Sequence, residues 1–119
     1  MFVDNAISGS VPFKIDSDIK EKWVCALRSG EYNQTQSQLH NSITGGYCCL
    51  GVLAKLTGMQ MDINGHGIVN EHGVGEGYGP LRAIIGSEKI IETLWMMNDG
   101  HGNRSHSFNE IADFIETNL

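Results

Sequence analysis

Basic residues are scarce in this chain of 119 residues. Eight lysines and arginines stand against fourteen acidic residues, which gives a net charge of −6. Nonspecific binding of DNA or RNA needs a basic face, so we do not expect bulk nucleic acid as a partner. No apolar run approaches the roughly 20 residues that span a bilayer. The first residues also lack the basic and apolar regions of a signal peptide. The sequence therefore predicts no membrane partner.

Cysteine is also scarce. The chain has only Cys25, Cys48 and Cys49. An odd count that includes an adjacent pair does not fit a disulfide framework. We therefore expect the protein in a reducing cytoplasm.

Glycine, in contrast, is abundant. The 15 glycines are close to twice the usual share, and six of them lie in residues 65–79. The length fits a single domain, 1–119, with one hydrophobic core. We expect residues 1–15 to form an arm or an edge strand, and residues 65–79 to form a glycine-rich loop with a short strand at 68–69.

Apolar spacing predicts four helices. The first begins near Ser17 and ends at Ser29-Gly30, and the second runs from about 47 to 57. The third begins at Ser87 and stops at Asn98-Asp99-Gly100, and the fourth begins at Ser107, which with Glu110 forms a capping box. Residues 31–46 and 59–63 favour strands. The predicted fold is α+β, with about four helices packed on a small antiparallel sheet.

The Cys48-Cys49 pair raises the hypothesis of a cysteine hydrolase. A cysteine at a helix N-terminus can have a lowered pKa, because the helix dipole stabilises the thiolate. His66 or His72 would then act as the base. The alternative is core packing, since Cys49 shares a helix face with Val52 and Leu53. We favour the alternative, because no histidine stands at diagnostic spacing.

Metal and phosphate sites have weaker support. The histidine pairs are five and six residues apart, whereas structural zinc sites prefer closer pairs, so no metal and no cofactor are expected. The glycine-rich stretch lacks the spacing of a phosphate loop, and Glu76 would repel a phosphate. A flap that closes over a ligand fits the stretch better. Its residues would be Gly75, Gly77, Tyr78 and Gly79.

Several polar and aromatic side chains suit the binding of a small ligand. Pockets combine aromatic walls with a few placed donors, and an arginine can hold a phosphate through two parallel hydrogen bonds. Arg28 is the strongest candidate, because its helix leads directly into the polar segment 31–46. The predicted ligand-binding residues are Arg28, Tyr32, Gln34, Gln38, Tyr47 and Arg104.

Three blocks of the sequence carry a resemblance to known proteins. They are KWVCALRSGEYNQ, then GGYCCLGVLAKLTG, and finally MMNDG followed by SFNEIADFIETNL. In order and pattern they resemble a group of small phage and prophage proteins without an assigned activity. The resemblance implies phage origin and a shared fold, and it implies no site residues. It places the protein in the cytoplasm of the infected bacterial host.

Phage origin favours a role in opposing host defence. The leading hypothesis is an accessory protein, acting as a homo-oligomer, that sequesters a small nucleotide-like immune signal without catalysis. A cyclic dinucleotide or a cyclic ADP-ribose derivative would be such a signal. A second hypothesis is the cysteine hydrolase. A third is an inhibitor that docks on a basic host protein through the acidic face of its last helix, which carries Glu110, Asp113 and Glu116.

Overall fold

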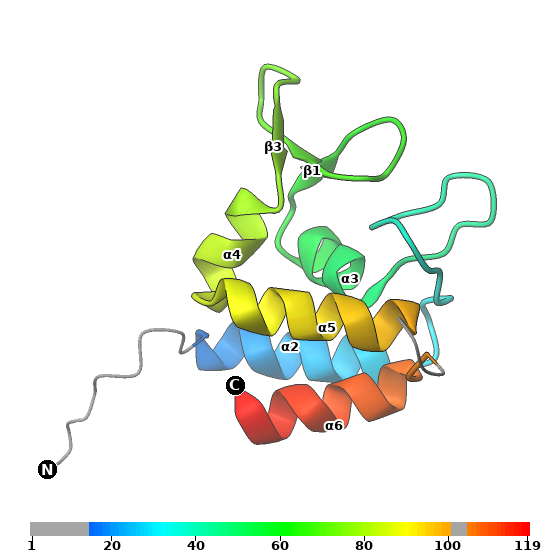
Figure 1. Ribbon diagram of the computed structural model, residues 1–119, viewed down its shortest axis with the longest axis vertical. Helices are drawn as coiled ribbons and strands as arrows, with labels where there is room; N and C mark the ends of the chain where they lie inside the picture. Colours follow the sequence, from blue (N-terminus) through cyan, green and yellow to red (C-terminus); the bar gives the residue numbers. More distant parts are fainter. Residues whose placement is uncertain (1–14, 101–104) are drawn as a thin grey trace, which may run out of the picture.

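The computed structural model describes residues 15–100 and 105–119. Within these residues the chain forms five helices and three short strands, shown in Figure 1. In chain order the elements are α2 (Ser17–Arg28), α3 (Cys49–Leu56), β1 (Gln60–Met61), β2 (Ile68–Val69), β3 (Gly75–Gly77), α4 (Gly79–Ile85), α5 (Glu88–Asp99) and α6 (Phe108–Asn118).

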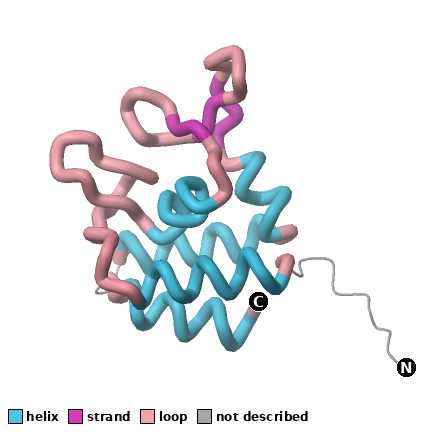
Figure 2. The backbone as a smooth tube through the Cα atoms, turned by 180° about the vertical axis from the view of Figure 1, so that it is seen from behind, coloured by secondary structure: helices cyan, strands magenta, loops and turns pink. Residues whose placement is uncertain are grey.

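The helices build the core by packing on one another. Helix α2 packs most extensively on α6 and also contacts α3, while α5 contacts α3, α4 and α6. Figures 1 and 2 show α2, α5 and α6 side by side, with α3 next to them. The apolar stripes expected from the sequence face inward here. The largest fully buried side chains include Trp23, Leu50, Leu53, Leu94, Ile111 and Ile115.

The sheet lies at one end of this helical body rather than beneath it (Figure 1). Its strands are antiparallel in the order β1-β2-β3, with a register shift between Ile68 and Val69. Strand β1 contacts α3, and β3 contacts α4. The α+β class and the antiparallel sheet are confirmed, but the expected packing of helices on the sheet is wrong. Strands of two or three residues, with β3 fully exposed, are too small to cover a helical layer.

Helix α4 is the element that the sequence prediction missed. The structure has five helices in its described residues instead of the expected four. The additional helix, α4, begins inside the expected glycine-rich loop. Gly79, assigned to a flap, is its first residue, and the segment before it forms β2, a turn and β3. Two signals were present in the sequence: Pro80 in the first helical turn, and Gly86 at the end in a left-handed conformation.

The helix boundaries agree closely with the sequence. Asp16, Ser87 and Ser107 cap α2, α5 and α6, and both hydrogen bonds of the Ser107–Glu110 capping box are present. In residues 31–46 the structure has isolated bridges, Gln34 with Tyr47 and His40 with Tyr47, in place of the expected strand. The expected N-terminal arm lies outside the described residues except for Ile15. No helix among the described residues is long and apolar enough to cross a membrane.

Candidate functional site

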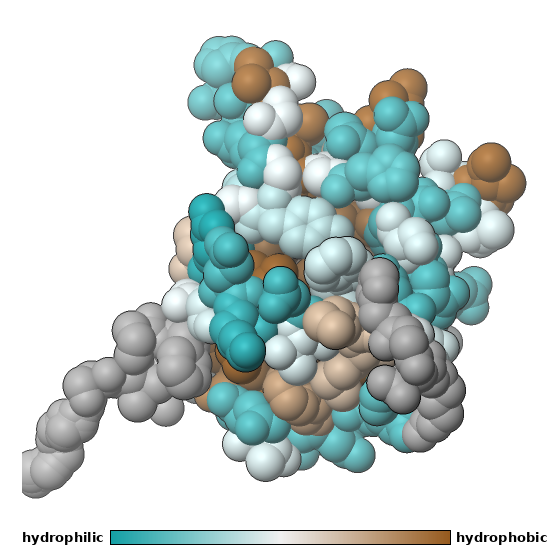
Figure 3. Space-filling model, in the orientation of Figure 1, coloured by the Kyte–Doolittle hydropathy of each residue, from teal (hydrophilic) through white to brown (hydrophobic). Residues whose placement is uncertain are grey.

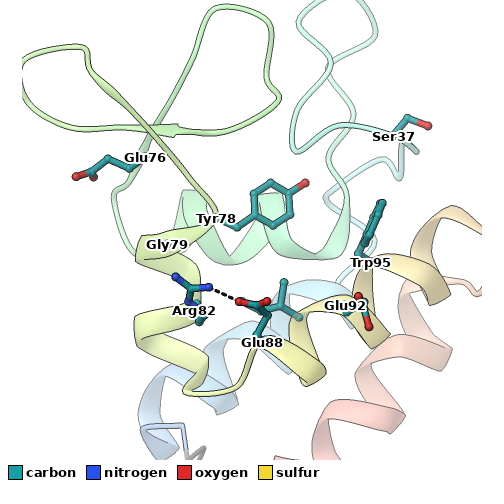
Figure 4. A pocket seen from close by; sticks show the side chains of 9 residues that line it. Ser37, Glu76, Tyr78, Gly79, Arg82, Glu88, Glu92 and Trp95 are labelled. Carbon is teal, nitrogen blue, oxygen red and sulfur yellow. Dashed lines mark hydrogen bonds and ion pairs between the residues drawn. The ribbon is translucent and has the colours of Figure 1, made fainter.

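A cavity of about 530 Å³ opens between the start of α4 and one face of α5 (Figure 4). This volume lies in the range of small-molecule and side-chain binding sites. Strand β3 and the segment before α3 complete its wall. The lining residues are Ser37, Glu76, Tyr78, Gly79, Arg82, Glu88, Ile91, Glu92 and Trp95.

Helix α5 supplies the floor and one end of the cavity. Glu88, Ile91, Glu92 and Trp95 are spaced at i, i+3, i+4 and i+7, so they share one helix face. Ile91 is buried, whereas Trp95 is 40% exposed. The Arg82 guanidinium forms an ion pair with Glu88 across the cavity. With three carboxylates and one guanidinium, the lining carries a negative charge.

Tyr78 forms the opposite wall. It is the N-cap of α4 and is half-buried, and in Figure 4 its ring lies above the Arg82–Glu88 pair. Burial, with smaller contributions from Cys48, Asp99 and Cys49, raises the pKa of the Tyr78 hydroxyl to about 12. The hydroxyl therefore stays neutral at physiological pH.

Ser37 lies at the rim of the cavity in an unusual backbone conformation. Its φ of 70° makes it the one non-glycine residue with positive φ in the described parts of the chain. Its backbone N–H donates a hydrogen bond to Asp99 Oδ1 at 3.0 Å, which holds the conformation. Backbone strain of this kind costs about 1–3 kcal/mol and is concentrated at binding sites.

Cys48 occupies the helix position that the hydrolase hypothesis required. It is the N-cap of α3, and its Sγ accepts a hydrogen bond from the Gly51 N–H at 3.4 Å. Burial nevertheless raises the pKa of its thiol from 9.0 to about 11, so the expected lowering of the pKa is wrong. Cys49 is completely buried, as the core interpretation predicted. His66 and His72 lie exposed in the turns before and after β2.

Arg28 does not lie at this cavity. Its guanidinium is hydrogen-bonded to Asp113 at 2.5 Å and to Glu116 at 3.1 Å, and these bonds to α6 raise its pKa. Arg28 was predicted to bind a ligand, and the two acidic residues were predicted to dock on a basic protein. The structure pairs them with one another instead. This ion-pair group joins the C-terminal end of α2 to α6.

The other predicted ligand-binding residues fall into two groups. Tyr32 and Tyr47 lie together, with ring centroids 5.5 Å apart in an edge-on arrangement. Gln34 and Gln38 each donate hydrogen bonds within the fold: Gln34 to Asn98 Oδ1 and the His106 carbonyl, Gln38 to the carbonyls of His40 and Asn64. Arg104 lies outside the described residues.

Of the predicted flap, Gly75 and Gly77 form β3, while Tyr78 and Gly79 line the cavity. Sequence reasoning missed the rest of the lining apart from Glu76. The polar face of α5 is the signal that could have identified these lining residues. On this face Trp95 follows Glu92 by one turn and Glu88 by two turns. No group of three or more potential metal ligands occurs among residues 15–100 and 105–119.

The fold defines the chain as a small α+β domain with a helical core and a three-stranded sheet at one end. Residues 15–75 match the model of a family described as a domain of unknown function (DUF8296). Because the match spans just over half of the chain, the protein belongs to this family. Comparison with curated proteins and with solved structures found no match. The matched segment contains α2, α3, β1 and β2.

Proposed function

We propose that the protein is a non-catalytic binding protein that docks on a basic partner protein. The observation that carries this proposal is the cavity, which combines Tyr78 and Trp95 with the carboxylates of Glu76, Glu88 and Glu92. Aromatic rings and carboxylates together attract a cationic group. The proposal retains the docking hypothesis of the sequence analysis but moves the docking surface from α6 to the cavity face.

The charges of the lining bear on the nucleotide hypothesis. A phosphate in the cavity would lie beside the carboxylates of Glu88 and Glu92, and the single guanidinium of Arg82 is already paired with Glu88. Arg28, the cation on which that hypothesis depended, is held by Asp113 and Glu116. Electrostatic complementarity therefore favours a cation over a phosphate. Sequestration of a nucleotide stays a prediction from the sequence, and so does the formation of a homo-oligomer.

Exposed apolar side chains on three turns support a protein partner. Ile43 is 93% exposed, Ile63 91% and Val74 58%. Figure 3 shows brown, hydrophobic surface at the ends of the projections above the helical body. Exposed apolar side chains at these tips would add apolar contact area when a partner protein binds.

Two of these turns are held in shape by asparagine side chains. Asn41 Oδ1 accepts hydrogen bonds from the N–H groups of Ile43 and Thr44, and Asn70 Oδ1 accepts them from His72 and Val74. A turn that is already ordered loses little conformational entropy when it binds. In the phage setting that the resemblance implies, the partner would be a host protein of the bacterial cytoplasm, and docking would oppose its defensive role.

A titration with defined ligands tests the proposal. Binding of a poly-arginine peptide, of a cyclic dinucleotide and of cyclic ADP-ribose is measured by calorimetry. We expect the peptide to bind, with an affinity that falls as salt is added. Glu92→Lys should weaken peptide binding about ten-fold or more, because it reverses a charge in the cavity.

The matched control is Glu21→Lys, which makes the same charge change on an exposed glutamate of α2. Equal weakening by both variants would mean that only net charge matters, which would contradict a site at the cavity. Binding of either nucleotide in preference to the peptide would restore the nucleotide hypothesis.

A further inference from the structure

We infer that the cavity receives the guanidinium group of a single arginine side chain of the partner. This inference rests on the proposed function and names the chemistry of the same site. Three features of the cavity carry it: an unpaired carboxylate, an aromatic end wall beside it, and an internal example of the same interaction.

Glu92 is the unpaired carboxylate. In the described parts of the chain, the ion pairs are those of Arg28 with Asp113 and Glu116 and that of Arg82 with Glu88. Glu92 follows Glu88 by one helical turn on the same face, yet forms no ion pair there. The carboxylate is therefore available to a cation that enters the cavity.

Trp95 stands beside this carboxylate. Figure 4 shows its indole ring at one end of the cavity, close to Glu92, with the Arg82–Glu88 pair at the other end and Tyr78 above. Glu76 extends away from these side chains in the same view. A cation at Glu92 would thus lie one helical turn from the Trp95 indole, which can supply a cation–π contact.

The geometry favours arginine over lysine. A guanidinium is planar and weakly hydrated, so it can stack on an indole while it donates two parallel hydrogen bonds to one carboxylate. The buried Ile91 at the floor offers an apolar surface to the aliphatic part of the side chain. Arg82 already forms a guanidinium–carboxylate ion pair with Glu88 in the same cavity, through a single N–O contact.

The test uses N-acetyl-arginine amide as the probe and follows the two tryptophan indole N–H signals by NMR. Trp95 lines the cavity, whereas Trp23 is completely buried and its indole N–H donates to the Cys49 carbonyl at 2.9 Å. The arginine probe should shift the Trp95 signal with a dissociation constant in the millimolar range. The Trp23 signal should stay in place, which also shows that the fold is intact.

Two further probes define the specificity: one is neutral, and the other carries the same charge on a different group. N-acetyl-citrulline amide has the same shape without the charge and should leave the Trp95 signal unchanged. N-acetyl-lysine amide should bind several-fold more weakly than the arginine probe. Glu92→Gln should weaken arginine binding on the order of five-fold, while Glu71→Gln, which removes a charge from an exposed turn outside the cavity, should not.

The outcomes separate this inference from the proposed function. Equal shifts with arginine and citrulline, tighter binding of lysine, or loss of binding in both glutamine variants would each overturn the arginine site. No shift with any single amino acid amide, together with retained poly-arginine binding, would overturn the inference and leave the docking proposal standing. If the poly-arginine peptide also failed to bind, both would fall.

Discussion

At the scale of the residue, burial decides the chemistry of Cys48. Its position at the N-terminus of α3 would stabilise a thiolate, as the sequence suggested, by an interaction of about 1 kcal/mol. The thiol is only 5% exposed, however, and removal of the thiolate from water outweighs the dipole. The pKa rises to about 11 as a result. The sequence could predict that Cys48 lies at a helix start, because neighbouring residues determine this. It could not predict the burial of the thiol, because other elements of the fold cover it.

The raised pKa predicts a loss of stability in alkali. Below pH 9 the Cys48 thiol is protonated in both the folded and the unfolded chain. Above pH 9 the unfolded chain releases the proton, whereas the folded chain keeps it until about pH 11. The free energy of unfolding should therefore fall across this interval, with Cys48 contributing about 3 kcal/mol. Urea unfolding at a series of pH values measures this. Cys48→Ala should show a shallower fall, and parallel curves for the two proteins would contradict the assignment.

At the scale of the element, what the sequence predicted well is what neighbouring residues determine. The caps of α2, α5 and α6 depend on side chains within three residues of the helix start, and the observed starts of these three helices agree with the sequence prediction. Helix α4 has only seven residues and its N-cap, Tyr78, makes no side-chain hydrogen bond, so its signal was weak. The strand expected at 31–46 was wrong because alternation of polar residues alone provides no apolar face to bury.

At Gly51, helix α3 lies directly against the backbone of the loop that precedes it. A Cβ at this helical glycine would overlap the Leu39 carbonyl oxygen. Gly51→Ala should therefore destabilise the protein by about 3 kcal/mol, since α3 must move from the backbone at Leu39. Gly75→Ala is the control, because a Cβ at Gly75 meets nothing within 4 Å. Thermal unfolding of both variants compares them, and equal stability would show that α3 can shift freely.

At the scale of the whole molecule, the candidate site depends on contacts that the sequence does not display. The sequence predicted that Arg28 binds a ligand, but its partners Asp113 and Glu116 lie 85 and 88 residues further along the chain. The cavity likewise forms only when Tyr78 and Arg82 are brought against Glu92 and Trp95. Residue types identified suitable side chains, whereas the tertiary fold determined which of them pair internally and which face a cavity.

Asn98 connects the parts of the molecule that support this cavity. It is completely buried, and its Oδ1 accepts hydrogen bonds from the Cys49 N–H and from Gln34, while its Nδ2 donates to the Thr35 carbonyl and to Asp99. Asn98→Asp keeps the shape but removes both donors and places a second carboxylate beside Asp99. A loss of about 3 kcal/mol or more is expected from the unsatisfied carbonyl and the buried charge.

The cost of Asn98→Asp should also depend on pH. Protonation of the new carboxyl group removes its charge, so the difference in the free energy of unfolding between the variant and the original protein should shrink as the pH falls below neutrality. Denaturant unfolding at several pH values measures this difference. Asn109→Asp, on the exposed face of α6, is the matched control and should show little change. If the two substitutions cost the same, Asn98 does not hold α3, α5 and residues 34–35 together.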